Sequence, residues 1–245
     1  MTRVKICGVK DAATAIAAAE AGADFVGIMF ADSRRRVTPE ECHEVVTAIH
    51  ERRKYAAPVT VPGPERGEVS NRSWYGAWHE AIEEVLFYRR PLLVGVFANQ
   101  EAAHINDIAD AAKLDIVQLS GGESDDFVRQ IERPVLRAVH VGERTAADDV
   151  LEKAPPGIGH AILLDTASED ARGGTGERFD WAVAAEASRL VPIMLAGGLD
   201  PDSVGDAIRT ASPWAVDVSS GVETDGAKDV EKIVAFVRAA KGARV

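Results

Sequence analysis

The sequence predicts a closed barrel of eight parallel β-strands, each followed by a helix, and three observations lead to this prediction. Short apolar runs bounded by turn residues alternate with helical patterns almost from end to end of the chain. These strand–helix units number eight, and 245 residues is the length of a single α/β barrel. Glycine-bearing loops cluster after the last two expected strands, where such barrels commonly bind phosphate. A doubly wound open sheet is the structural alternative.

The expected strands are short runs rich in Val, Ile, Leu and Phe, as is typical of parallel strands that are buried on both faces. They cover residues 4–7, 25–30, 92–97, 116–119, 135–139, 160–164, 193–196 and 215–218. Cys7 and Gly8 follow the first of these runs, so that a thiol stands where the strand ends.

Helix signals fill the intervals between the strands. An alanine-rich helix is expected over 11–21 and closed by Gly22, and a second begins at Pro39 with Thr38 as its N-cap and Glu41 in the capping-box position. The remaining helices are expected over 100–112, over 124–131 with Ser124 as a cap, over 146–151, from 180, from 201, and over 227–240.

One connection is far longer than the barrel needs. About 35 residues separate the second helix from the strand at 92–97, where about 2–6 would suffice. We therefore expect residues 1–245 to form one domain with an insertion at 55–90. Prolines and glycines in 56–73 predict a loop, and the apolar stripe that follows predicts a helix through Trp74, Trp78, Ile82, Val85 and Leu86. Such a connection lies at the face that serves stability, so packing beneath the barrel is favoured over a substrate lid, and a subunit contact is possible.

Composition narrows the function classes. A formal net charge of −11 argues against general nucleic-acid binding, which requires a basic face. We see no apolar run of about 18 residues, which argues against a membrane span. No signal segment is recognisable, so the expected location is the cytoplasm. The two cysteines, Cys7 and Cys42, cannot build a disulfide framework and fit a reducing compartment. The histidines form no metal-spaced cluster, so no metal site is expected.

Alternation along the first strand puts Lys5 and Cys7 on one face. A lone thiol in such a position is more often a packing residue than a reactive one. Lys5 could assist the thiol, but an unpaired lysine inside a barrel would be costly. We therefore expect Lys5 to pair with Asp217 on the eighth strand, which neighbours the first in a closed barrel.

Seven motifs, in order and covering the chain except for about 55–90, resemble the signature of phosphoribosylanthranilate isomerase, an enzyme of tryptophan biosynthesis. They are Lys5-Ile6-Cys7-Gly8, Val94-Gly95-Val96-Phe97, Gln118-Leu119, Leu163-Leu164-Asp165, Gly173-Gly174-Thr175-Gly176 with Phe179-Asp180-Trp181, Leu195-Ala196-Gly197-Gly198-Leu199, and Asp217-Val218-Ser219-Ser220-Gly221-Val222-Glu223.

The resemblance implies an Amadori rearrangement of an aminoaldose phosphate to an aminoketose phosphate without a cofactor. By analogy with the family, Asp165 would be the general acid that protonates the ribose ring oxygen. Cys7 would be the general base that removes the proton from the sugar C2. The partner would be a small phosphorylated substrate, and the protein a monomer or a homodimer.

The same resemblance and the loop chemistry suggest how substrate is held. Loops with backbone N–H groups suit a phosphate, and serine hydroxyls can add donors. The residues expected there are Gly197, Gly198, Ser219, Ser220 and Gly221, with Gly174 in a loop that closes over substrate. Arg35 aligns with the family's arginine and would bind the anthranilate carboxylate. Gln118 is expected to support the site.

Two positions depart from the family pattern. Arg34 stands where the family has proline, which leaves the choice among the neighbouring arginines open. Ser120 replaces the histidine of Gln-Leu-His-Gly, so whatever that histidine does must be done by serine, by water or not at all. The alternative functions are another phosphosugar isomerase or epimerase on the same fold, and a phosphosugar-binding barrel without catalysis.

Overall fold

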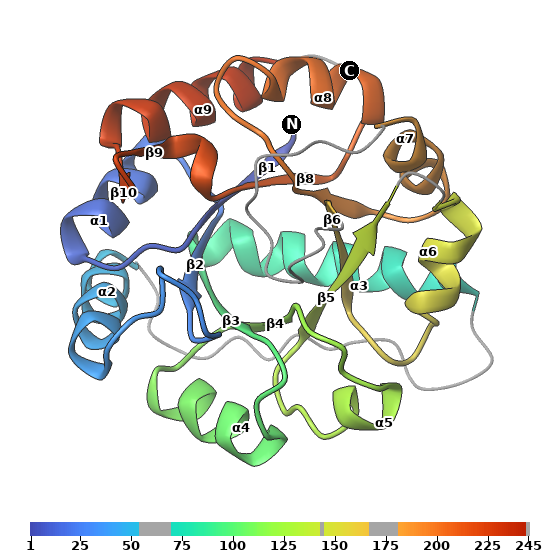
Figure 1. Cartoon of the computed structure of the whole chain (residues 1–245), viewed down its shortest axis with the longest axis horizontal. Coiled ribbons are helices and arrows are strands. Elements are labelled where there is room, and N and C mark those ends of the chain that lie inside the picture. The colour runs from blue at the N-terminus through green and yellow to red at the C-terminus, as the bar shows by residue number, and fades with distance from the viewer. Residues whose placement is uncertain (54–69, 143–144, 167–180, 244–245) are drawn as a thin grey trace.

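In a computed structural model, the described residues are 1–53, 70–142, 145–166 and 181–243, and within them eight parallel strands close into a barrel (Figure 1). The strands are β1 (Arg3–Cys7), β2 (Phe25–Met29), β3 (Leu92–Phe97), β4 (Ile116–Leu119), β5 (Val135–Val141), β6 (Ala161–Thr166), β7 (Ile193–Leu195) and β8 (Ala215–Val218). Each strand pairs with the next, and β8 pairs with β1. The predicted fold class is confirmed, and the open sheet is excluded.

Helices surround the barrel (Figure 1). They are α1 (Ala12–Ala21), α2 (Pro39–Arg52), α4 (Ala102–Ala111), α5 (Asp125–Val128), α6 (Ala147–Lys153), α7 (Trp181–Leu190), α8 (Val204–Ala211) and α9 (Val230–Gly242). Local signals define several ends. Thr38 and Glu41 form the expected capping box of α2, and Gly22 closes α1 with a φ of 99°.

Strand alternation separates two apolar layers. Side chains on the outer faces of the strands, such as Ile6 and Val26, pack against the helices. Side chains on the inner faces, including Phe25, Leu163 and Met194, fill the lower part of the barrel. Each fully buried side chain of this size contributes roughly 1.5–3 kcal/mol.

The helix α3 (Asn71–Tyr88) closes the end of the barrel where the strands begin. Its Ile82, Val85 and Leu86 join the inner apolar cluster. The Trp74 indole donates a 2.6 Å hydrogen bond to the Gly159 carbonyl, just before β6, and the Trp214 indole, just before β8, donates to Glu83 at 2.7 Å. This helix is therefore a floor beneath the strands. The earlier part of the expected insertion, residues 54–69, lies outside the described residues.

Several element bounds differ from prediction. Strand β5 continues to Val141 and β6 to Thr166, so Asp165 lies within its strand rather than after it. The helix expected from 201 is α8, which begins only at Val204. The helix expected over 124–131 is the shorter α5.

The helix expected from 227 is wrong in its first turn. Residues Glu223–Thr224 (β9) and Ala227–Lys228 (β10) pair as a hairpin, and α9 begins only at Val230, capped by Asp229. The tight turn requires positive φ, which Gly226 adopts at 82°. Among the described helices, none is long and apolar enough to cross a membrane.

Candidate active site

Above the apolar layer, the carboxyl ends of the strands carry polar side chains. Register pairs Lys5 with Asp217 between β1 and β8, and His140 with Asp165 between β5 and β6. Gln118 on β4 is register partner of Leu136, which belongs to the inner cluster. Because residues paired in register share a face, these side chains project from several strands toward one interior.

The expected ion pair between Lys5 and Asp217 is present. The Lys5 ammonium lies 3.0 Å from an Asp217 carboxylate oxygen, and the lysine side chain is fully buried. Burial alone would lower the pKa of Lys5, but Asp217 and, after it, Cys7 more than offset this and raise the pKa. Lys5 is therefore held as a charged group in the barrel interior.

Cys7 ends β1 beside this pair, and its position depends on Gly27 of β2. A Cβ on Gly27 would lie 3.0 Å from the Cys7 Sγ and 3.3 Å from the Lys5 Cε. Burial raises the pKa of Cys7, and Asp217 adds to this, whereas the positive charges of Lys5 and Lys228 act in the opposite direction. The thiol is thus protonated at rest, with cations near it that favour the thiolate.

Asp165 faces the same interior from β6. Burial raises the pKa of its carboxyl, and the neighbouring Asp217 raises it further, while His140 and Lys5 oppose the shift. One carboxyl oxygen accepts a 2.8 Å hydrogen bond from the Thr166 backbone N–H. The result is a partly buried carboxyl that retains its proton more readily than an ordinary aspartic acid, as a proton donor must.

The loops after β7 and β8 lie in contact at the mouth. Gly197 and Gly198 both have positive φ, 86° and 64°. A Cβ on Gly221 would overlap the Leu199 carbonyl oxygen, so a side chain at 221 would push the two loops apart. The Ser219 hydroxyl donates to the Cys7 carbonyl at 3.2 Å, which connects the loop after β8 to the end of β1. Gly174 lies outside the described residues.

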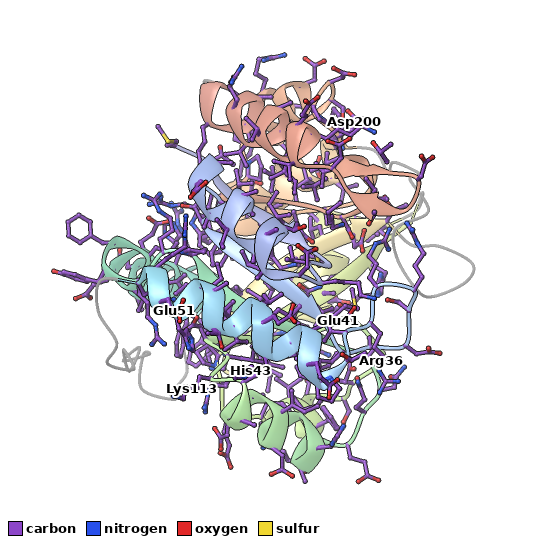
Figure 2. The ribbon with its side chains drawn as sticks, turned by 90° about the vertical axis from the view of Figure 1, so that its left-hand side faces the viewer. Arg36, Glu41, His43, Glu51, Lys113 and Asp200 are labelled. Carbon is purple, nitrogen blue, oxygen red and sulfur yellow. The ribbon has the colours of Figure 1, made fainter. Side chains whose placement is uncertain are left out.

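Three consecutive arginines follow β2 and have different surroundings. Arg35 is 11% exposed and grips Glu223 with two hydrogen bonds, Nε to Oε1 at 2.7 Å and Nη2 to Oε2 at 3.2 Å. Its Cδ lies 2.7 Å from where a Gly8 Cβ would be, so Arg35 covers the turn after Cys7. Arg34 also pairs with Glu223 but is 54% exposed. Arg36 lines a groove between α2 and α4 (Figure 2).

Ser120, which directly follows β4, belongs to a small polar network with Gln118 and His140. The Gln118 amide nitrogen donates to the Ser120 hydroxyl at 2.9 Å, while the buried Gln118 Oε1 has no hydrogen-bond partner among the described residues. His140 Nε2 lies 3.2 Å from the Ser120 carbonyl oxygen. Since a carbonyl can only accept, this nitrogen carries a proton.

Sequence reasoning did not identify four residues of this site: Gly27, His140, Glu223 and Lys228. Glu223 is part of a motif quoted above, but no role was predicted for it. Its position just after a loop of the phosphate-binding type could have indicated that it lies at the site. Lys228 lay in a segment expected to be helical, and only the hairpin brings it back to the mouth. His140 was hidden because β5 was expected to end one residue earlier. No group of three or more His, Cys, Asp or Glu side chains suited to a metal occurs in the part of the chain that the structure describes.

Comparison with known proteins gives consistent matches. The family model described as N-(5'phosphoribosyl)anthranilate (PRA) isomerase matches residues 52–239. An N-(5'-phosphoribosyl)anthranilate isomerase of Dehalococcoides mccartyi is 38% identical over 99% of this chain and 97% of its own length. The enzyme of the same name from Geobacter sulfurreducens is 36% identical over 99% of this chain and 100% of its own.

Solved structures agree with these matches. Phosphoribosyl anthranilate isomerase from Thermotoga maritima superposes with a TM-score of 0.74 at 32% identity, covering 99% of this chain and 100% of that one. A phosphoribosyl anthranilate isomerase in complex with reduced 1-(o-carboxyphenylamino)-1-deoxyribulose 5-phosphate gives 0.70 at 32% identity with the same coverage.

Proposed function

The chain belongs to the phosphoribosylanthranilate isomerase family and has that isomerase activity in tryptophan biosynthesis, and we propose that Cys7 and Asp165 are its general base and general acid. One observation carries the assignment. Lys5 and Asp217 act on the pKa of both Cys7 and Asp165, so the thiol and the carboxyl share one electrostatic neighbourhood. A sugar entering the mouth would meet both groups.

The reaction balances without an external oxidant or reductant. Asp165 donates a proton to the ribose ring oxygen, the bond from C1 to that oxygen breaks, and the lone pair of the aniline nitrogen forms a C=N iminium. The Cys7 thiolate then removes the C2 proton, and the C–H electrons form a C1–C2 double bond as the iminium becomes an amine. Water supplies the proton at C1 and takes the C2 hydroxyl proton to give the aminoketose. Water also returns a proton to Asp165 and takes the proton from the Cys7 thiol, so that the acid and the thiolate are restored. No cofactor is required, because the electrons move only within the substrate.

The pKa directions suit these roles. A carboxyl whose pKa is raised by burial holds its proton to a higher pH than an ordinary aspartic acid, as a general acid must. A buried thiol is a poor base on its own, since its pKa is also raised. The iminium that forms next to C2 adds a positive charge beside the sulfur and makes the C2 proton more acidic. Acid transfer therefore precedes base transfer in this proposal.

Binding is assigned to the loops at the mouth. We assign the substrate phosphate to the backbone N–H groups of the two loops that touch at the mouth, namely those of Gly197, Gly198, Ser219, Ser220 and Gly221, and to the Ser220 hydroxyl. Arg35 would bind the anthranilate carboxylate. Glu223 occupies its Nε and Nη2, and Nη1 has no hydrogen bond to any described residue. That guanidinium edge suits a ligand carboxylate. Gly174 would belong to a loop that closes over the bound sugar.

Three further assignments complete the proposal. The insertion is part of a single barrel domain, and α3 serves stability, as supported by its contacts with the apolar interior. The protein acts in the cytoplasm, in keeping with its two free cysteines. It is a monomer or a homodimer. The Thermotoga maritima relative is described as dimeric.

Two measurements test the catalytic assignment. Expression of the wild-type chain should restore growth of a tryptophan auxotroph that lacks this isomerase. In a fluorescence assay of substrate consumption, Cys7→Ala and Asp165→Asn should each lower kcat by about 10²–10⁴-fold with unchanged melting temperature. Cys42→Ser, on α2 outside the barrel, is the matched control and should behave as wild type. Full turnover by either site variant would refute that residue's role.

A further inference from the structure

We propose that Lys228 is a positioning residue of this isomerase, holding the loop after β8 against the end of β1 and supplying a buried positive charge that stabilises the Cys7 thiolate. This inference rests on the role of Cys7 proposed above. It concerns a residue on the β9–β10 hairpin, more than 200 positions from the thiol in sequence, that no motif pointed to.

The contacts of Lys228 connect the elements of the mouth. Its ammonium donates at 2.8 Å to the Ser219 carbonyl and at 2.8 Å to Glu223 Oε1, and lies 3.4 Å from the Ser219 hydroxyl. That hydroxyl in turn donates to the Cys7 carbonyl. Glu223 grips Arg35 from the loop after β2. One ammonium thus ties the loop after β8 to β1 and to the arginine that covers Gly8.

Burying the Lys228 ammonium costs desolvation free energy, which interactions with other groups must offset. The Lys228 side chain is only 5% exposed. Burial lowers its pKa, while Glu223 and Cys7 act to raise it. An apolar side chain of similar length would fill the same space without the desolvation penalty. The retained charge therefore points to an electrostatic role.

The charge balance distinguishes Lys228 from Lys5. Lys5 is neutralised by Asp217, and Asp217 raises the pKa of Cys7, which offsets part of what Lys5 does. In contrast, Glu223 is shared by Arg34, Arg35 and Lys228, so this cluster carries excess positive charge among the described residues.

The charged groups that act on Cys7 come from three of the elements packed around it. Lys5 is on its own strand, Asp217 is on β8 and Lys228 is on β10. From the β2 side, Gly27 contributes no charge, and Arg35 covers Gly8. Removing Lys228 should therefore raise the pKa of Cys7, because an opposing charge is lost while Asp217 remains.

The test compares Lys228→Met and Lys228→Gln, which remove the charge, with Lys228→Arg, which keeps it. Lys232→Met is the matched control, because Lys232 donates to the Glu223 backbone carbonyl from the exposed face of α9. All variants carry Cys42→Ser, so that the ultraviolet absorbance of the thiolate reports Cys7 alone. Melting temperature establishes that each variant is folded.

Loss of the charge should move the Cys7 titration and the limb of the kcat–pH profile that Cys7 sets upward together, by about one unit. It should lower kcat at neutral pH by about tenfold. Lys228→Arg should keep both values close to wild type, and Lys232→Met should leave them unchanged. Lost activity with an unmoved thiol titration would overturn the proposal, since that result indicates packing alone. Unchanged titration and activity would overturn it equally.

The thiol titration can fail or succeed independently of the proposed function, so the two proposals are tested separately. If Cys7→Ala retains turnover, the base assignment fails. The effect of Lys228 on the thiol can still be read from absorbance, because that measurement needs no catalysis.

Discussion

The two ends of the barrel each surround a carboxylate with three cations, but they do so for different purposes. At the floor, Asp24 is fully buried and pairs with Arg3, Arg90 and Lys241, and it also accepts the Val4 backbone N–H at 2.8 Å. At the mouth, Glu223 pairs with Arg34, Arg35 and Lys228. The ion pairs at the floor join β1, the segment before β3 and α9, whereas those at the mouth hold the side chains that we propose bind substrate.

The two clusters differ in whether the N–H groups of a central arginine, Arg3 at the floor and Arg35 at the mouth, are all used in hydrogen bonds within the protein. Arg3 at the floor is satisfied by two carboxylates, Asp24 and Glu83, and α3 covers the strand ends around it. At the mouth, Arg35 keeps one guanidinium edge without a hydrogen bond to any described residue, beside loops that can accept a phosphate. A saturated cluster stabilises, whereas an unsaturated one can bind. The floor should therefore respond to mutation in stability, and the mouth in kinetics.

The substitution Asp24→Asn at the floor should have the largest effect. Removing the carboxylate leaves three cations near one another without their shared partner, and breaking a buried pair in this way costs roughly 3–5 kcal/mol of unfolding free energy. Urea denaturation should show this loss, while kcat of the folded protein stays near wild type. A variant with normal stability and impaired kcat would remove the distinction between floor and mouth.

The matching change at the mouth is Glu223→Gln. Arg35 would lose its two charge-assisted hydrogen bonds, so KM should rise roughly tenfold, equivalent to about 1.4 kcal/mol of lost substrate binding. Kinetics in the fluorescence assay measure this. An unchanged KM would mean that Arg35 needs no support from Glu223.

Glu223 also predicts a pH dependence. Burial would raise its pKa, but hydrogen bonds from Arg35 and Lys228 lower it from 4.5 to about 2. A carboxyl with a depressed pKa in the folded state contributes stability that is complete above its unfolded pKa and is lost as pH falls toward the folded value. Wild-type melting temperature should therefore drop between about pH 4.5 and 2, and Glu223→Gln should show a smaller drop in that window.

The smallest expected effect is that of His140→Gln. His140 opposes the upward shift in the pKa of Asp165, so its removal should raise that pKa further. In the proposed mechanism Asp165 acts in its protonated form, so the limb of the kcat/KM–pH profile that Asp165 sets should move to higher pH by less than about one unit. A shift to lower pH would contradict the electrostatic contact.

The sequence by itself determined the parts of this protein that depend on neighbouring residues. Apolar runs specified the eight strands, Thr38 with Glu41 specified the start of α2, and Gly22 specified the end of α1. The resemblance motifs added the family and the candidate acid and base, since Cys7 and Asp165 stand at strand ends that a barrel brings to one mouth.

Apart from the Lys5–Asp217 pair, which follows from the neighbouring positions of the first and last strands, only the tertiary structure decided which charges meet. Arg35 and Glu223 are 188 positions apart, and Lys241 and Asp24 are 217 apart, so no local pattern announces either contact. Residues 227–228 were expected to begin the last helix, and only the structure shows that they pair with 223–224 and that Lys228 contacts the Ser219 loop. Local propensity acts over a few residues, whereas closure of the barrel selects ion pairs from distant segments, because a buried charge must find its partner wherever the fold provides one.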